Sequence, residues 1–527
     1  MKNNNVRVRY SVRQLEQMHK DGNTKPLDDL IRAWKGIKEL PPEDLNSFFN
    51  LAGYHGEPFT GGGAYNAKYW GGYCNHGNVL FPTWHRVYVL KIEEALQSIE
   101  GCEDVMMPYW DETSEESLKD GIPEILTKEQ VELDGKTINN PLISYTFPVQ
   151  VDDLETDPVG AYAYTKPAGY TTVRYPLSGL VGTEEARIKT LIHNDKYPDY
   201  DTNVKLLNTN VKGWLNAGPT SPPTNLKKAK ALPPDGSIHR KYIDCLDAPN
   251  YTLFSNTTSA GAFHDANPKQ RKVTPLEYPH NDVHLSVGGY DFPGFESGLI
   301  ADSNGDMGEN NTASFDPIFF FHHCNVDRMF WLWQKRNGKT DDFEIDSSDE
   351  GAKSGQGQGP TPNFPWDSVL SMDSPLNPFM ISPLENQRIY TSRDVINIEK
   401  QLGFTYSEGS LEEDEVAPVL SMAKERSMKE PKVLKVSGIN RELFTGSFII
   451  AAYAQVGDEK ILLGTESILS RWSVKQCANC LNHLEVQAHF SLDKLTDKQI
   501  HMAEFSIDIR SREKSLPAGL EYKLEVI

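Results

Sequence analysis

The chain has 527 residues, of which 38% are hydrophobic and 10% aromatic, so it is long enough for two domains and apolar enough to build a core. Its formal net charge of −21 argues against nucleic acid and anionic membranes as partners. The N-terminal segment lacks the apolar stretch of a secretory signal, and no run approaches the ~20 apolar residues of a membrane span. We therefore expect a cytoplasmic or otherwise intracellular location, with export by a route that leaves no such signal as the alternative.

Helical periodicity dominates the first hundred residues. The segments 11–20 and 27–40 carry helical signals, and the second ends before a proline. Residues 81–99 repeat apolar positions at helical spacing, on a stripe that includes His85. Residues 112–270 contain many Pro, Gly, Asn and Thr residues and predict long loops with short elements.

The second half of the chain changes character near residue 408. Two helices are expected before it, one within 275–287 and one over 315–335 that begins at an Asp-Pro pair. Residues 408–430 are charged and weakly apolar, and we expect an exposed linker there that proteases can cut. Beyond it the periodicity becomes two, so the sequence predicts a core over 1–407 and a small β domain over 431–527.

The 14 histidines are unevenly distributed. Seven of them gather in two windows, one with His55, His76 and His85, the other with His280, His284, His322 and His323. Histidines four residues apart share one helix face and can chelate one metal, as expected for His280 and His284. Helix neighbours point about 100° apart, so His322 and His323 cannot both bind the same ion. We predict His323 as the ligand and His322 as a packing residue or a support for the ligands.

Two all-histidine trios fit two metal ions. Imidazole suits copper, zinc, iron and nickel, and no HExxH motif of a hydrolytic zinc site occurs in either window. A copper pair that cycles between the cuprous and cupric states fits, but ligand chemistry alone leaves zinc open. The remaining lone histidines are more often ordinary core or surface residues, and five are left unassigned: His19, His193, His239, His264 and His501.

Four segments closely resemble the copper-binding signatures of the type-3 copper family, which contains tyrosinases, catechol oxidases and molluscan-type hemocyanins. They are AGYHGEPF, CNHGNVLFPTWHRVYVLKIEEAL, EYPHNDVHLSVGG and SFDPIFFFHHCNVDRMFWLW, in the expected order between residues 50 and 335. The tail LGFTY, with Phe404 and Tyr406, resembles the motif that closes the family core. The resemblance implies a mainly α core, with a four-helix bundle that holds a dicopper site amid long loops, and a smaller, β-sandwich-like C-terminal domain.

Carried over residue by residue, the resemblance implies the metal ligands. The first copper is expected on His55, His76 and His85, and the second on His280, His284 and His323. Oxygen would be the co-substrate and small phenols the substrates. Cys74 lies two residues before His76 and, as in fungal members, is expected to form a thioether to that ring, unless it is a plain buried thiol.

Other family positions bear on the substrate. Glu277 and Asn281 are expected to hold a water that deprotonates the phenol, whose pKa is near 10. The alternative is that Glu277 only caps its helix and Asn281 only packs. The ring of Phe319, one turn before His323, is expected to stack near that imidazole, and Leu285 and Asn310 are expected to shape substrate access.

The C-terminal region contains the motif CANC, formed by Cys477 and Cys480, with His483 three residues on. A CxxC pair suits cuprous ion, and some fungal protyrosinases carry such a pair in a domain that covers the active site and assists copper loading. A redox disulfide or a structural turn is the alternative. The resemblance also implies that Ile468, Leu469 or Trp472 plugs the copper pocket, and that cutting within 408–430 activates a latent chain.

The predicted activity is therefore ortho-hydroxylation of monophenols and oxidation of o-diphenols to o-quinones. A catechol oxidase without monophenolase activity is the first alternative. A hemocyanin-like oxygen carrier is less favoured because such proteins normally come as repeated modules, and a zinc hydrolase is the remote alternative.

Overall fold

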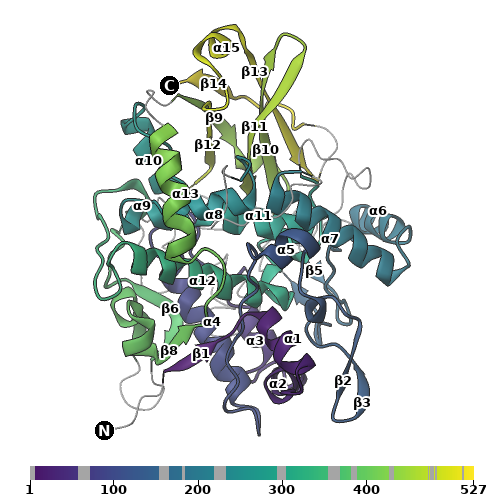
Figure 1. The fold of residues 1–527 in the computed structure, drawn as a ribbon. Coiled ribbons are helices and arrows are strands. Elements are labelled where there is room, and N and C mark those ends of the chain that lie inside the picture. Colours follow the sequence, from purple (N-terminus) through teal and green to yellow (C-terminus); the bar gives the residue numbers. More distant parts are fainter. Residues whose placement is uncertain are drawn as a thin grey trace.

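The structure divides into a helical core and a β-rich unit that lies on top of it (Figure 1). It is a computed structural model that describes residues 6–56, 72–152, 165–180, 184–218, 233–292, 304–353, 368–381, 388–426, 432–472, 474, 480, 483–512 and 516–527. The predicted combination of a mainly α core with a smaller β unit at the C-terminal end is confirmed. Within the described residues, no helix is both long enough and apolar enough to cross a lipid bilayer.

Four helices form the centre of the core: α2 (Lys25–Glu39), α4 (Phe81–Gln97), α11 (Glu277–Gly288) and α12 (Ile318–Arg336). Helix α4 packs on α2 and on α12, and α12 also packs on α11. Every residue of α11 is buried, as is α12 from Ile318 to Gln334, because both helices are covered on all sides. These contacts fit the predicted four-helix bundle, whose detailed geometry stays a prediction.

The predicted helix starts carry capping signals. Helix α1 (Val12–Lys20) begins with a capping box in which Ser11 and Gln14 bond each other's backbone N–H groups. A proline lies in the first turn of both α2 and α4, where its missing N–H is not needed. Pro317 is the residue directly before α12.

The stretch 112–270 contains more helix than the sequence predicted. Its helices are α5 (Glu115–Asp120), α6 (Glu184–Asn194), α7 (Tyr200–Asn216), α8 (Ile238–Cys245), α9 (Tyr251–Ser255) and α10 (Thr257–Ala266). The prediction of long loops was wrong for α7 because its Asn and Thr residues hide an apolar stripe. Leu207, Val211 and Trp214 on that stripe are buried, so tertiary packing overrides weak propensity.

Short strand pairs lie at the edge of the core. Strand β1 (Arg7–Arg9) pairs in parallel with β8 (Phe404–Tyr406), which carries the aromatic motif. The other pairs are β2 (Gln130–Leu133) with β3 (Lys136–Asn139), β4 (Val151–Asp152) with β5 (Thr165–Lys166), and β6 (Pro375–Met380) with β7 (Ile389–Thr391). The pairing of β1 with β8 holds the two ends of the core together.

Asp327 of α12 is the centre of a buried ionic network. Its carboxylate accepts hydrogen bonds from Arg86 Nε at 2.5 Å and from Tyr406 Oη at 2.5 Å. Arg9 lies 3.4 Å from the same carboxylate and also donates to Glu93. Its helix neighbour Arg328 pairs instead with Glu412. Asp327 therefore orients α4, α12 and both edge strands.

The segment predicted to be an exposed linker is partly packed on the core. It contains helix α13 (Glu413–Arg426), and Leu411, Val416 and Leu420 are buried in the main hydrophobic cluster. Glu412 binds Arg328 at 2.8 Å. The first half of the segment is therefore anchored, and the domain boundaries stay a prediction.

The β-rich unit consists of two antiparallel three-stranded sheets, ordered β11–β10–β13 and β12–β9–β14. Their strands are β9 (Val433–Asn440), β10 (Phe448–Val456), β11 (Glu459–Ile468), β12 (Glu485–Ser491), β13 (Glu504–Ser511) and β14 (Lys523–Val526). Side chains alternate along β10, so Ile450 joins the unit's own hydrophobic cluster while Ile449 joins the core cluster. The unit is thus attached to the core by an apolar sheet face.

Replacing Arg86 by Met should destabilise the fold. The change leaves the buried carboxylate of Asp327 without its closest cation, and breaking a buried pair in this way costs about 3–5 kcal/mol of unfolding free energy. Urea unfolding followed by circular dichroism measures the loss. The control is Arg388→Met, which removes an exposed ion pair with Asp394 and should leave the unfolding transition in place. Equal shifts in the two variants would contradict the role given to the network.

Candidate metal centre

Helices α11 and α12 bring three imidazoles of the second window together. The Nε2 atom of His280 lies 3.1 Å from that of His284 and 3.3 Å from that of His323. The third distance, between His284 and His323, is also 3.3 Å. All three side chains are fully buried.

The protons of the His280 and His284 rings are fixed on their outer nitrogens. His280 Nδ1 donates to the amide oxygen of Asn281 at 2.9 Å, and His284 Nδ1 donates to the carbonyl of Met307 at 2.9 Å. Their Nε2 atoms therefore both carry lone pairs, although they face each other. Burial lowers the pKa of both rings well below the ordinary value, which keeps them neutral. Lone pairs this close need a cation between them.

The first window forms a similar cluster. One nitrogen from each of His55, His76 and His85 lies within 4.8 Å of the others, and their ring centroids are 5.1 to 5.6 Å apart. His55 follows the short helix α3 (Phe48–Ala52), and His85 lies in the first turns of α4. His85 Nδ1 donates to the carbonyl of Phe81 at 2.8 Å, so its inner nitrogen is free to bind a metal.

The two clusters are adjacent. The rings of His85 and His323 stack at 4.5 Å, and those of His76 and His280 lie 5.5 Å apart. Phe319 stacks on His323 at 4.0 Å, as predicted, and its edge contacts His55. Among the described residues, the groups able to hold a metal contain histidine only, which fits two copper ions better than carboxylate-rich hydrolytic zinc.

His322 lies beside the second cluster, but its hydrogen-bond partner, Glu112, lies outside that cluster. Its Nδ1 donates to Glu112 Oε1 at 2.6 Å, and the other oxygen of Glu112 accepts from the hydroxyl of Tyr242 at 2.6 Å. All three side chains are fully buried. Sequence reasoning placed His322 outside the ligand set, but it missed Glu112, which lies 210 residues away and belongs to no metal-binding pattern.

Glu277 and Asn281 lie next to the clusters. One carboxylate oxygen of Glu277 accepts from Gly77 N at 2.7 Å, and the other accepts from the backbone and hydroxyl of Thr257. The carboxylate thereby fixes the backbone next to His76. Asn281 donates through Nδ2 to the carbonyl of Ser467, on strand β11, at 3.3 Å.

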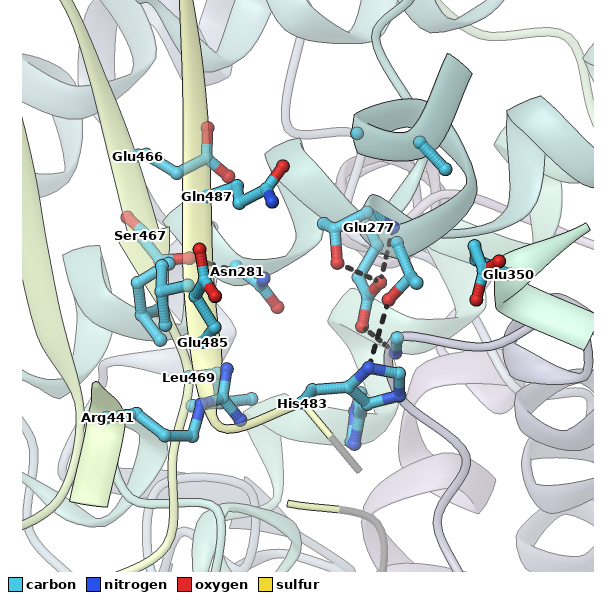
Figure 2. A pocket seen from close by; sticks show the side chains of 18 of the residues that line it. Glu277, Asn281, Glu350, Arg441, Glu466, Ser467, Leu469, His483, Glu485 and Gln487 are labelled. Atoms are coloured by element: carbon cyan, nitrogen blue, oxygen red, sulfur yellow. Dashed lines mark hydrogen bonds between the residues drawn. The ribbon is translucent and has the colours of Figure 1, made fainter. Parts of the chain in front are cut away.

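A cavity of about 350 Å³ lies between the core and the β-rich unit, with His76, Glu277 and Asn281 in its wall. Figure 2 shows Glu277 on one side of this cavity and Ser467 and Leu469 on the other, with His483 and Arg441 below. Two of the predicted plug residues, Ile468 and Leu469, line it. The β-rich unit therefore covers the approach to the first cluster.

The loop after β11 also binds the core. Ser470 O accepts from the backbone N–H of Asn310, and Trp472 N donates to Asn311 Oδ1 at 2.8 Å. Asn310 thus contacts the covering unit, and its side chain approaches Cys74 Sγ at 3.9 Å. Leu285 has no exposed surface and lies in the main hydrophobic cluster. Cys480 is buried, whereas Cys477 lies outside the described residues.

Comparisons with known proteins agree with this arrangement. The common central domain of tyrosinase matches residues 45–336. The tyrosinase HcTyr2 of Hahella sp. (strain CCB-MM4) is 53% identical over 97% of this chain and 92% of its own length. A tyrosinase of Aspergillus oryzae is 43% identical over 91% of this chain and 88% of its own length.

Solved structures give the same result. A tyrosinase from Burkholderia thailandensis superposes with a TM-score of 0.85 at 50% identity, covering 99% of this chain and 100% of that one. The protyrosinase of Aspergillus oryzae shares the fold, with a TM-score of 0.65 at 19% identity. The chain therefore belongs to the tyrosinase family of type-3 dicopper enzymes.

Proposed function

We propose that this tyrosinase hydroxylates monophenols at the ortho position and oxidises o-diphenols to o-quinones with O2. The observation that carries the proposal is the convergence of buried imidazole lone pairs in two adjacent clusters. In this proposal the first copper is held by His55, His76 and His85, and the second by His280, His284 and His323. Bound copper would supply the activation of O2 and the Lewis acidity that favours a phenolate.

The chain's own residues prepare the phenol. A phenol has a pKa near 10, so it must lose a proton to bind as phenolate, and a water held by Glu277 and Asn281 accepts that proton. The position of both residues in the cavity wall supports this role. In this proposal Phe319 and His284, whose rings meet edge to face at 5.6 Å, also stack against the phenol ring. Asn310, which contacts the loop after β11, shapes the approach, whereas the fully buried Leu285 acts only by packing behind His284.

A thioether between Cys74 and His76 fits the closeness of the two residues in sequence. It would lock the orientation of one ring of the first cluster. Mass spectrometry of the peptide that contains both residues would reveal the bond as a loss of two hydrogen atoms, one from the thiol and one from the imidazole ring, and an unchanged mass would show a free thiol.

The C-terminal unit makes the chain latent in this proposal. Its support is the set of contacts from β11 and the following loop to Asn281, Asn310 and Asn311. Lys241 of α8 adds a hydrogen bond to Thr465 O at 2.8 Å. The pair Cys477 and Cys480 would receive cuprous ion and pass it to the core, a role supported by the position of nearby His483 in the cavity wall.

Replacing His323 should remove one copper ion per chain. His323→Gln deletes one of three converging Nε2 atoms, whereas His322→Gln leaves all three in place. Copper is measured by elemental analysis after dialysis against cuprous ion and then buffer. The expected contents are one copper per chain for His323→Gln and two for both His322→Gln and the parent. The opposite pattern would show that the ligand assignment is wrong.

Replacing Asn281 should separate the two activities. Asn281→Ala removes one of the two groups that hold the proton-accepting water, so the monophenol rate should fall by roughly 10²-fold. An o-diphenol is oxidised without prior hydroxylation, and its rate serves as the internal control. Because Asn281 also accepts from His280 Nδ1, copper content is measured in the same variant, and equal losses for both substrates with two copper ions still bound would argue against the proposed role. A parent enzyme that oxidises only o-diphenols would favour the catechol oxidase alternative.

Cutting the chain between α13 and β9 should release the activity. A specific protease site is placed within residues 427–431, and the fragments are separated by size-exclusion chromatography. The freed core, checked for helix content by circular dichroism, should oxidise phenols roughly tenfold faster or more, because the cavity is no longer covered. The control is the same site in the exposed turn at Asp134–Gly135. Equal rates before and after separation would contradict latency.

A further inference from the structure

A fourth imidazole lies next to the second histidine cluster. One nitrogen each of His280, His284, His322 and His323 lies within 4.8 Å of the others. The ring of His322 stacks on that of His280 at 5.3 Å and meets that of His284 edge to face at 5.2 Å. The core therefore offers four imidazoles where the proposed second copper uses three. The angle of about 100° between His322 and His323 on the helix, which predicts that they cannot share an ion, does not keep their nitrogens apart.

The spacing of the other three rings already suits one metal ion. Ligands ~2.0 Å from a tetrahedral metal lie ~3.3 Å from one another. The Nε2 atoms of His280, His284 and His323 are 3.1 to 3.3 Å apart. Three ligands leave a position open for a substrate, whereas four close the site, as in structural metal centres. A phenol can therefore bind to the second copper only if His322 does not coordinate that ion.

Glu112 is the residue that holds His322. Its Oε1 accepts a hydrogen bond from Nδ1 of His322, and its Oε2 accepts one from the hydroxyl of Tyr242, both at 2.6 Å. The backbone beside Glu112 is tied to the same helix as His322, because Trp110 N donates to Phe321 O at 3.1 Å. Both oxygens of a fully buried carboxylate are thus committed, which fixes its position.

We propose that Glu112 is a positioning residue that keeps His322 off the second copper and so preserves the open coordination position for substrate. The inference rests on the proposed function, in which that copper binds the phenol. Without Glu112, the His322 ring loses its buried partner and has a metal within reach of a small rotation. The site would then keep its copper and lose its ability to bind an external ligand.

The test uses the cupric full-length holoenzyme with azide, a small anion that needs an open position on the metal. Azide affinity is measured by absorption titration, and copper content by elemental analysis. Glu112→Leu should keep two copper ions per chain and bind azide roughly tenfold more weakly or worse. The double variant Glu112→Leu with His322→Leu should regain azide affinity to within about threefold of the parent, because the competing imidazole is gone.

Two controls separate positioning from general stability. Tyr242→Phe removes the second hydrogen bond of Glu112 but leaves its contact with His322, so azide affinity should stay while the thermal midpoint falls. Glu112→Gln keeps a hydrogen-bonding group against His322 and should rescue azide binding. If Glu112→Leu does not fold, Glu112→Asp gives the same comparison, because its shorter carboxylate does not reach His322.

Failure of the inference would be seen in the variants, whereas failure of the proposed function would be seen in the parent enzyme. If the double variant binds azide no better than Glu112→Leu, Glu112 has a structural role only and the inference is wrong. Loss of copper from Glu112→Leu would also overturn it. If the parent itself binds no copper or oxidises no phenol, the proposed function fails instead.

Discussion

The structure depends on buried imidazoles whose outer nitrogens are already used. The Nδ1 protons of His85, His280 and His284 are donated to fixed oxygen atoms, so the lone pairs of their Nε2 atoms point inward. In a dry interior such lone pairs repel one another unless a cation lies between them. Folding therefore builds a repulsive arrangement that a metal relieves, and the strong helix contacts around it hold that arrangement together.

The surrounding core holds the imidazoles in place with buried charged groups as well as with apolar packing. Asp327, one turn after His323, joins α12 to α4 through its ion pair with Arg86. One buried ion pair thus connects the helix that carries His85 with the helix that carries His323. Glu112 joins α8 to α12 in the same way, through Tyr242 and His322. Buried ion pairs and hydrogen bonds are directional, and they set the relative rotation of two helices more sharply than side-chain packing does.

The sequence predicted what lies close together along the chain. The spacing of His280 and His284, the all-histidine windows and the Asp-Pro start of α12 all led to correct local structure. The sequence alone could not predict Glu112 because its partners lie 130 and 210 residues away and a buried carboxylate has no local signature. Helix α7 was missed because its Asn and Thr residues obscure the stripe that packing stabilises, and α13 because its charged surface resembles a linker.

The β-rich unit that covers the cavity accepts a hydrogen bond from Asn281, a residue that the proposed reaction also uses. Asn281 has one amide group, whose oxygen accepts the proton of His280 Nδ1 and whose nitrogen donates to Ser467 O of the covering strand. Under the proposed mechanism that same nitrogen side holds the water that accepts the phenol proton. The amide nitrogen carries two N–H bonds, so the two uses compete for the small space beside it rather than for the donor itself. Under the proposal, covering the cavity would therefore crowd a proton-handling residue as well as block entry, and uncovering would free both at once.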